Sequence, residues 1–216
     1  MSLLLLRLAT ALLGGAATVW ALTRWGAAAP GSVRRAATPA LHATMLGLLL
    51  ALLAYPLRDA PPGEWIQGVL LTCLLYALAV TDLRTLHVPL PPVFAGMAAR
   101  VAYLALLERP ALLPMVLGLF AGAGMLTLAG LAHETARGRA GLGEGDAAVL
   151  GLIGGFVGWQ GLVPALLGAA LAGLIGGGGL LLVQRKPLDT PLPFAPFLAA
   201  GGWAVYAAQA AGWLPA

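Results

Sequence analysis

Long apolar stretches alternate with short polar connections along almost the whole chain, and most approach the roughly 20 residues that a membrane-spanning helix needs. We interpret a break at residues 158–161, followed by Pro164, as a tight hairpin between two helices that share one apolar run. The pattern predicts an all-α polytopic membrane protein with about eight transmembrane helices. Their expected ranges are Leu3–Thr23, Pro39–Leu57, Trp65–Thr81, Pro91–Leu107, Leu112–Ala132, Ala147–Gln160, Leu162–Gln184 and Pro193–Leu214.

The composition supports the same class of fold. The chain is 60% hydrophobic and 9% charged, whereas a soluble domain carries about 25% charged residues. A transmembrane β-barrel would instead show alternating segments of about ten residues. The connections leave no room for a soluble domain, so we expect a single integral membrane domain over residues 1–216. The longest connections, 24–38 and 133–144, are expected to be flexible segments.

The net charge of +4 is distributed over short connections, so we read it as membrane topology and predict no nucleic-acid partner. Lys and Arg residues are more numerous after the odd-numbered helices than on the opposite side, which places the former connections in the cytoplasm and both termini outside. The first set is Arg24, Arg34, Arg35, Arg84, Arg137, Arg139, Arg185 and Lys186, and the second is Arg7, Arg58 and Arg109. The single cysteine, Cys73, cannot form an internal disulfide or a zinc site by itself.

Two aspartates offer chemistry in this nearly uncharged chain. Asp82 follows the third predicted helix and Asp146 opens the sixth, so the topology puts both on the cytoplasmic side. Two carboxylates held close together cannot both ionise easily, which raises the pKa of one of them. The ionised group can then take a proton from water while the protonated group donates to a scissile carbonyl. The sequence therefore suggests an aspartyl protease site.

Residues beside the aspartates fit this interpretation. Gly143 and Gly145 carry no side chains, so a substrate backbone could approach Asp146 closely. Pro89 ends helical continuation after Asp82. We also expect a small-residue face on the sixth helix to receive the helix that bears Asp82. This face consists of Gly151, Gly154, Gly155 and Gly158.

Each acidic residue also has a purely structural interpretation. Asp146 is a good helix N-cap, and Asp82 could be a solvated loop residue balanced by Arg84. Glu144 is either an electrostatic neighbour of the pair or a solvated loop residue. The catalytic interpretation of the two aspartates is favoured because both lie on the same side of the membrane and because glycines flank Asp146.

At these residues the chain resembles the type IV prepilin peptidases, a family of GxGD intramembrane aspartyl proteases. The first motif is an aspartate at a helix end and a proline seven residues later, usually preceded by an aliphatic residue; here these are Asp82, Pro89 and Val88. The second is GxGD, here Gly143-Glu144-Gly145-Asp146, followed by a glycine-rich helix. A late segment, Pro193-Phe194-Ala195-Pro196-Phe197-Leu198-Ala199, is similar to a third family motif that has glycine at the position of Ala195.

The resemblance covers roughly residue 65 onwards, so we treat 1–60 as divergent N-terminal helices and 61–216 as the peptidase-like core. It implies a multi-pass enzyme of the inner (plasma) membrane that cleaves the basic leader from pilin-like precursors at the cytoplasmic face. The implied catalytic residues are Asp82 and Asp146, with Gly143, Glu144, Gly145 and Pro89 shaping the site. No metal or organic cofactor is implied, and the sequence does not indicate an oligomeric state.

Three departures from the family pattern keep a second interpretation open. Ala148 stands where the family usually has lysine, Leu90 where aspartate is common, and Ala195 where glycine is usual. The connection after the first helix contains no cysteine, so we expect no zinc domain there, and this counts against N-methyltransferase activity. The alternative function is a catalytically degenerate scaffold in pilus, secretion or competence assembly. A solute transporter is a weaker option, because few polar groups lie at mid-membrane depth.

Overall fold

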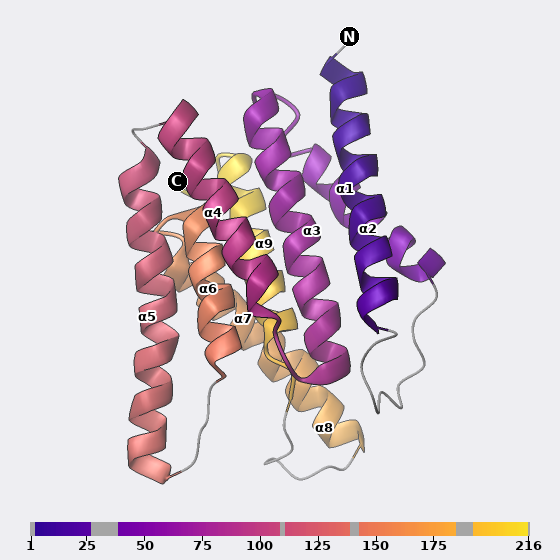
Figure 1. The fold of residues 1–216 in the computed structure, drawn as a ribbon. Helices are drawn as coiled ribbons and strands as arrows, with labels where there is room; N and C mark the ends of the chain where they lie inside the picture. Colours follow the sequence, from indigo (N-terminus) through magenta and orange to yellow (C-terminus); the bar gives the residue numbers. More distant parts are fainter. Residues whose placement is uncertain (1–2, 27–38, 109–110, 139–142, 185–191, 216) are drawn as a thin grey trace.

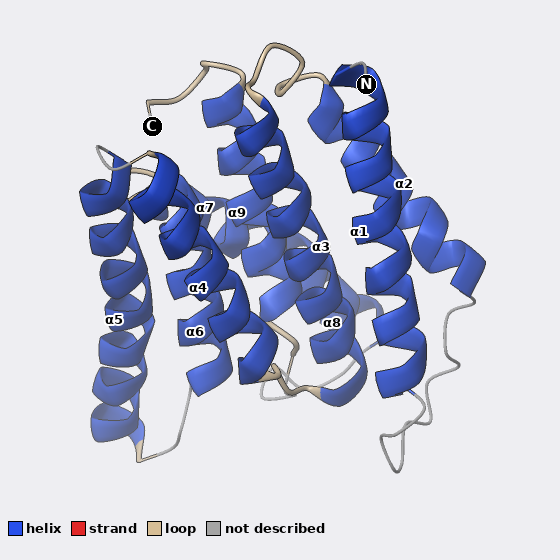
Figure 2. Ribbon diagram, turned by 45° about the horizontal axis from the view of Figure 1, so that its top comes forward, coloured by secondary structure: helices blue, strands red, loops and turns tan. Residues whose placement is uncertain are grey.

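The computed structural model describes residues 3–26, 39–108, 111–138, 143–184 and 192–215. Within these ranges the chain forms helices and no strands (Figure 2). Their order is α1 (Leu3–Gly26), α2 (Pro39–Ala54), α3 (Pro62–Thr85), α4 (Leu90–Leu107), α5 (Leu112–Arg137), α6 (Glu144–Val157), α7 (Leu162–Ala172), η2 (Gly173–Gly178), α8 (Gly179–Gln184) and α9 (Ala195–Ala210).

The helices run alternately up and down as one bundle (Figure 1). α7, η2 and α8 follow one another without a break, so the eight apolar stretches predicted from the sequence correspond to eight helical passes. In the described part of the chain, four helices, α1, α3, α4 and α5, are long and apolar enough to cross a membrane. Many large apolar side chains face outward, including Leu12, Leu106 and Phe120, as expected where lipid replaces water. The protein is an all-α polytopic membrane protein.

The predicted hairpin between the sixth and seventh passes is confirmed. α6 ends at Val157, and Gly158 then adopts a left-handed φ of 69°, a conformation that costs glycine little. The chain turns through residues 158–161 and re-enters the bundle as α7. The two termini consequently lie at the same end of the bundle (Figure 1).

Other predicted boundaries differ from the structure. α5 continues to Arg137, so the first part of the predicted 133–144 loop is helical. α3 continues to Thr85, which places Asp82 inside a helix rather than after it. Most of the predicted 24–38 loop lies outside the described residues, as do six basic residues of the topology count. These six are Arg34, Arg35, Arg109, Arg139, Arg185 and Lys186.

The most deeply buried helix is α6, which packs against α4, α5, α7 and α9. Its glycine face meets α5 rather than α3, which corrects our expectation from the sequence. Gly154 lies directly against Gly118 of α5, and Gly151 lies against the Leu119 carbonyl. Glycines on both helices let the two backbones approach closely. α9 packs against both α3 and α6, and thereby connects the two helices that carry the aspartates.

This close contact predicts a selective effect of one added methyl group. A Cβ at Gly118 would collide with the carbonyl oxygen of Gly154 and would lie 2.7 Å from the carbonyl carbon of Gly158. Gly118→Ala should therefore lower the free energy of unfolding by about 2 kcal/mol, a typical cost of overpacking. The measurement is reversible unfolding in mixed detergent micelles. Gly124→Ala on the same helix is the control, because nothing lies within 4 Å of its added Cβ. Equal stabilities of the two variants would contradict this account.

Candidate active site

Asp82 lies in the last turn of α3, and its side chain is buried, with 5% of its surface exposed. The interpretation of Asp82 as a solvated loop residue is therefore wrong. Its carboxylate Oδ2 accepts a hydrogen bond of 3.0 Å from the backbone N–H of Ala195 at the start of α9. Arg84 does not balance it, because the Arg84 guanidinium contacts His42 Nε2 on α2 at 2.6 Å. The hydrogen bonds to this carboxylate therefore come from the backbone at the start of α9 rather than from a basic side chain.

The chain reverses direction after α3 ends at Thr85, one turn of helix beyond Asp82. Leu86 caps α3 in the left-handed region at φ 53°, and its N–H donates to the Asp82 carbonyl at 2.8 Å. A bulky residue in this conformation is disfavoured by about 1–2 kcal/mol. The turn leads through buried Val88 to Pro89, which is the N-cap of α4. Pro89 therefore ends the loop, and its role in the site is to start the next helix.

Asp146 occupies the third position of α6, and Gly143 is the N-cap residue. The prediction of Asp146 as an N-cap is therefore wrong by three positions. The Asp146 carboxylate instead receives a hydrogen bond from the backbone of Gly143, a geometry typical of the third residue of a helix. Glu144 is exposed in the first helical turn. This position fits the interpretation of Glu144 as a solvated residue.

The two motifs meet through a contact between Val88 and Gly145. A Cβ placed on Gly145 would lie 2.7 Å from Val88 Cβ, a separation that real side chains do not adopt. Gly143 has more room, because the nearest atom to an added Cβ, Asp146 Oδ2, would lie 3.6 Å away. Gly145 is therefore required by packing against Val88, in the loop between α3 and α4. The sequence suggested only that it clears space for substrate.

The two carboxylates are close enough to affect each other's ionisation. Asp146 lies in the first turn of α6, ahead of the apolar span predicted to begin at Ala147. Burial, followed by the negative charge of Asp82, raises the pKa of Asp146 to about 6, and the Gly143 backbone contact opposes this shift. Such coupling between neighbouring carboxylates is what a shared-proton pair requires. The fold therefore brings together the two aspartates that the sequence singled out.

The contribution of the late Pro193–Ala199 segment could not be predicted from the sequence. The segment resembles a family motif, and this resemblance is the only feature of the sequence that points to it. Its contact with Asp82 joins residues 113 positions apart, which no local pattern predicts. The segment opens α9 at Ala195, whose side chain is completely buried.

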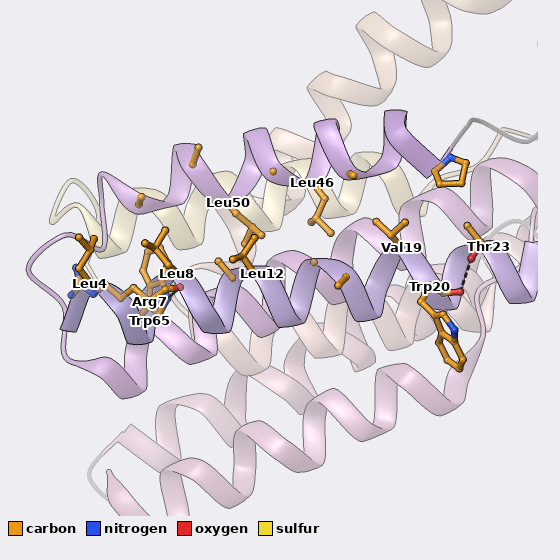
Figure 3. A pocket seen from close by; sticks show the side chains of 18 of the residues that line it. Leu4, Arg7, Leu8, Leu12, Val19, Trp20, Thr23, Leu46, Leu50 and Trp65 are labelled. Atoms are coloured by element: carbon orange, nitrogen blue, oxygen red, sulfur yellow. Dashed lines mark hydrogen bonds between the residues drawn. The ribbon is translucent and has the colours of Figure 1, made fainter. Parts of the chain in front are cut away.

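An apolar groove with a cavity volume of about 1030 Å³ lies elsewhere, between α1 and α2 (Figure 3). At one end, Arg7 donates to the carbonyls of Arg58 and Ala60, and its guanidinium stacks over Trp65. No predicted site residue lines the groove, so we do not assign the chemistry to it. In the described part of the chain, no group of three or more His, Cys, Asp or Glu side chains could hold a metal ion.

Comparison with known proteins agrees with the resemblance noted from the sequence motifs. The family model described as "Type IV leader peptidase family" matches residues 69–178. A "Prepilin leader peptidase/N-methyltransferase" of Aeromonas salmonicida is 32% identical over 167 residues, which cover 74% of this chain and 55% of the relative. The Xanthomonas campestris protein of the same name is 30% identical over 143 residues, covering 64% and 48% respectively.

The chain thus spans about half the length of these curated relatives. No solved structure matched it. The family model covers half of the chain, including both aspartate motifs. The chain therefore belongs to the type IV leader peptidase family.

Proposed function

We propose that the chain is a membrane aspartic endopeptidase that removes the basic leader from type IV pilin-like precursors, with Asp82 and Asp146 as its catalytic pair. The observation that carries the proposal is the electrostatic effect of the Asp82 charge on the Asp146 carboxyl, which comes from a different motif and a different helix. The family membership and the printed names of the relatives support the substrate class. The presence of both carboxylates in one site weighs against a degenerate scaffold.

The reaction needs one proton on the pair. The ionised carboxylate takes a proton from water, and the water oxygen bonds to the scissile carbonyl carbon. The protonated carboxylic acid gives its proton to the carbonyl oxygen, so a neutral diol forms and the pair still carries one proton. Collapse of the diol breaks the C–N bond: the carboxyl group that is now protonated gives its proton to the departing amine, and the other carboxylate takes the proton of a diol hydroxyl, which restores the pair to its starting state. Neither a metal nor an organic cofactor enters this scheme.

The distribution of charge supports a cytoplasmic site in the inner (plasma) membrane. The last turn of α3 and the first turn of α6, which carry Asp82 and Asp146, lie at the end of the bundle opposite the termini (Figure 1). The excess of Lys and Arg in the sequence belongs to the connections on the same side. A precursor would place its basic leader at that surface and its hydrophobic helix in the bilayer. The scissile bond between the leader and the helix would then lie at the depth of the aspartates.

The direct test is co-expression of this chain with a pilin precursor, followed by mass spectrometry of the precursor's amino end. We expect removal of the leader only when the chain is present. An intact leader, despite correct membrane insertion of both proteins, would contradict the proposal. The same spectra would show whether the new amino end is methylated, an activity that appears in the relatives' printed name.

The pKa of Asp146 predicts a descending limb in the pH profile. Because this pKa is raised to about 6, Asp146 keeps its proton below that pH and loses it above. Loss of this proton leaves two ionised carboxylates and no acid, so kcat/KM should fall as the pH rises through about 6. The measurement is cleavage of a purified precursor in lipid nanodiscs over a pH series. A kcat/KM that rises from pH 6 to pH 8 would contradict the assignment.

A further inference from the structure

The late segment contributes backbone, rather than side chains, to the surroundings of Asp82. The Ala195 N–H donates to Asp82 Oδ2 at 3.0 Å, and the backbone of Phe194 is a second hydrogen-bonding neighbour of this carboxylate. Asp82 is 5% exposed and Ala195 is fully buried, so burial itself disfavours a charge on Asp82, and the backbone donors are the contacts that oppose this effect. A carboxylate that accepts backbone N–H bonds is favoured in its ionised form.

Packing holds this segment in place. The ring of Phe197, in the first turn of α9, lies against Gly173, Gly176 and Gly177 of η2. Glycines on that helix let the ring approach closely enough to anchor the start of α9. The partial positive charge at the helix N-terminus adds to the attraction for an anion at Asp82. The position of the Ala195 amide therefore depends on tertiary contacts as well as on the local turn.

The surroundings of Asp146 are different. It accepts from the backbone of Gly143 in its own helical turn, and the negative charge of Asp82 adds to the burial that holds its proton. Among the residues that the structure describes, the ionisable groups that face Asp82 are Asp146 from α6 and His87 from the loop after α3. Two carboxyl groups in unlike surroundings usually divide the roles of acid and base.

From this geometry we infer that the Ala195 backbone amide is a positioning group that keeps Asp82 ionised, so that Asp82 acts as the general base and Asp146 as the general acid. The inference rests on the proposed catalytic pair and assigns the direction of proton transfer between water, the pair and the substrate. Asp82 accepts the proton from water, and Asp146 donates its proton to the carbonyl oxygen. The late motif of the family would thus act through its main chain.

The test removes a single N–H group. Lactic acid in place of Ala195 converts the amide to an ester, which keeps the methyl group but has no hydrogen to donate to Asp82. The control ester replaces Ala40, which lies in the first turn of α2 and on a different helix from Asp82 and Ala195. On the acidic side of the pH profile, kcat/KM should rise as Asp82 ionises. With the ester at 195, the midpoint of this acidic limb should move to a higher pH by about one unit. The ester at 40 should leave that limb in place.

A second readout does not depend on cleavage. Aspartate labelled at its carboxyl carbon gives four side-chain signals, from Asp59, Asp82, Asp146 and Asp189, which single Asp→Asn variants assign. Asp82 should ionise at a lower pH than Asp146, and the ester at 195 should bring the two ionisation midpoints closer together. If the ester chain does not fold, the order of ionisation in the parent decides.

The outcomes separate this inference from the proposed function. Ionisation of Asp146 before Asp82 would overturn the inference, as would an acidic limb that does not move in a folded ester at 195. A parent that titrates as expected but removes no leader would overturn the proposed function and leave the assignment of ionisation supported.

Discussion

Asp82→Asn and Asp146→Asn should each lower the rate of leader cleavage by about a thousandfold or more. Asparagine has nearly the same shape as aspartate but neither accepts a proton from water nor donates one to a carbonyl. Removing either partner therefore stops the exchange of protons on which the scheme depends. The measurement is single-turnover cleavage of a purified pilin precursor by each variant in lipid nanodiscs.

The pair also predicts a non-additive result. Once one partner is lost, the other has no step to perform, so the double variant should be no slower than the slower single variant. Asp59→Asn is the matched control, because the Asp59 side chain is 87% exposed and pairs with Arg58 outside the site. We expect it to cleave at the parental rate. Full activity in either Asp82→Asn or Asp146→Asn would remove the catalytic pair from the mechanism.

Much of the fold could be predicted because lipid imposes a simple rule on sequence. A spanning helix must satisfy its own backbone hydrogen bonds and expose apolar side chains, so each pass appears as an apolar stretch. The hairpin at 158–161 was also predictable, because Gly158 supplies the left-handed turn at the end of α6. Because successive passes alternate in direction, the sequence alone also predicts that Asp82 and Asp146 lie at the same end of the bundle.

The partners of each helix could not be predicted in the same way. The glycines of α6 indicated a close approach, but a small residue does not specify its neighbour, and the neighbour is α5 rather than α3. Likewise, nothing in the sequence around Asp82 indicates that its hydrogen-bond donor is the backbone amide of Ala195. Such contacts depend on how all the passes pack together. These packing contacts determine the immediate surroundings of the aspartates, and they are not visible in the local pattern around each aspartate.

Gly145→Ala should slow leader cleavage by about a hundredfold, because the added Cβ would lie 2.7 Å from Val88 Cβ. Relieving the contact requires the start of α6 and the loop after α3 to separate by roughly 1 Å, and a displacement of this size in a catalytic group can cost about a hundredfold. The variant should still insert and fold, since the change lies at the end of a helix. The measurement is kcat for the purified precursor, with Gly124→Ala as the control for a glycine replacement in open space.

Second-site changes at Val88 distinguish packing from substrate access. The collision involves Val88 Cβ, which Val88→Ala retains and Val88→Gly removes. Packing therefore predicts that Val88→Gly recovers part of the activity lost in Gly145→Ala, whereas Val88→Ala recovers much less. If Gly145 instead serves only to admit the substrate backbone, neither change at Val88 should help, because the new methyl group would still obstruct the substrate. Equal recovery with both replacements would contradict the geometry that joins the two motifs.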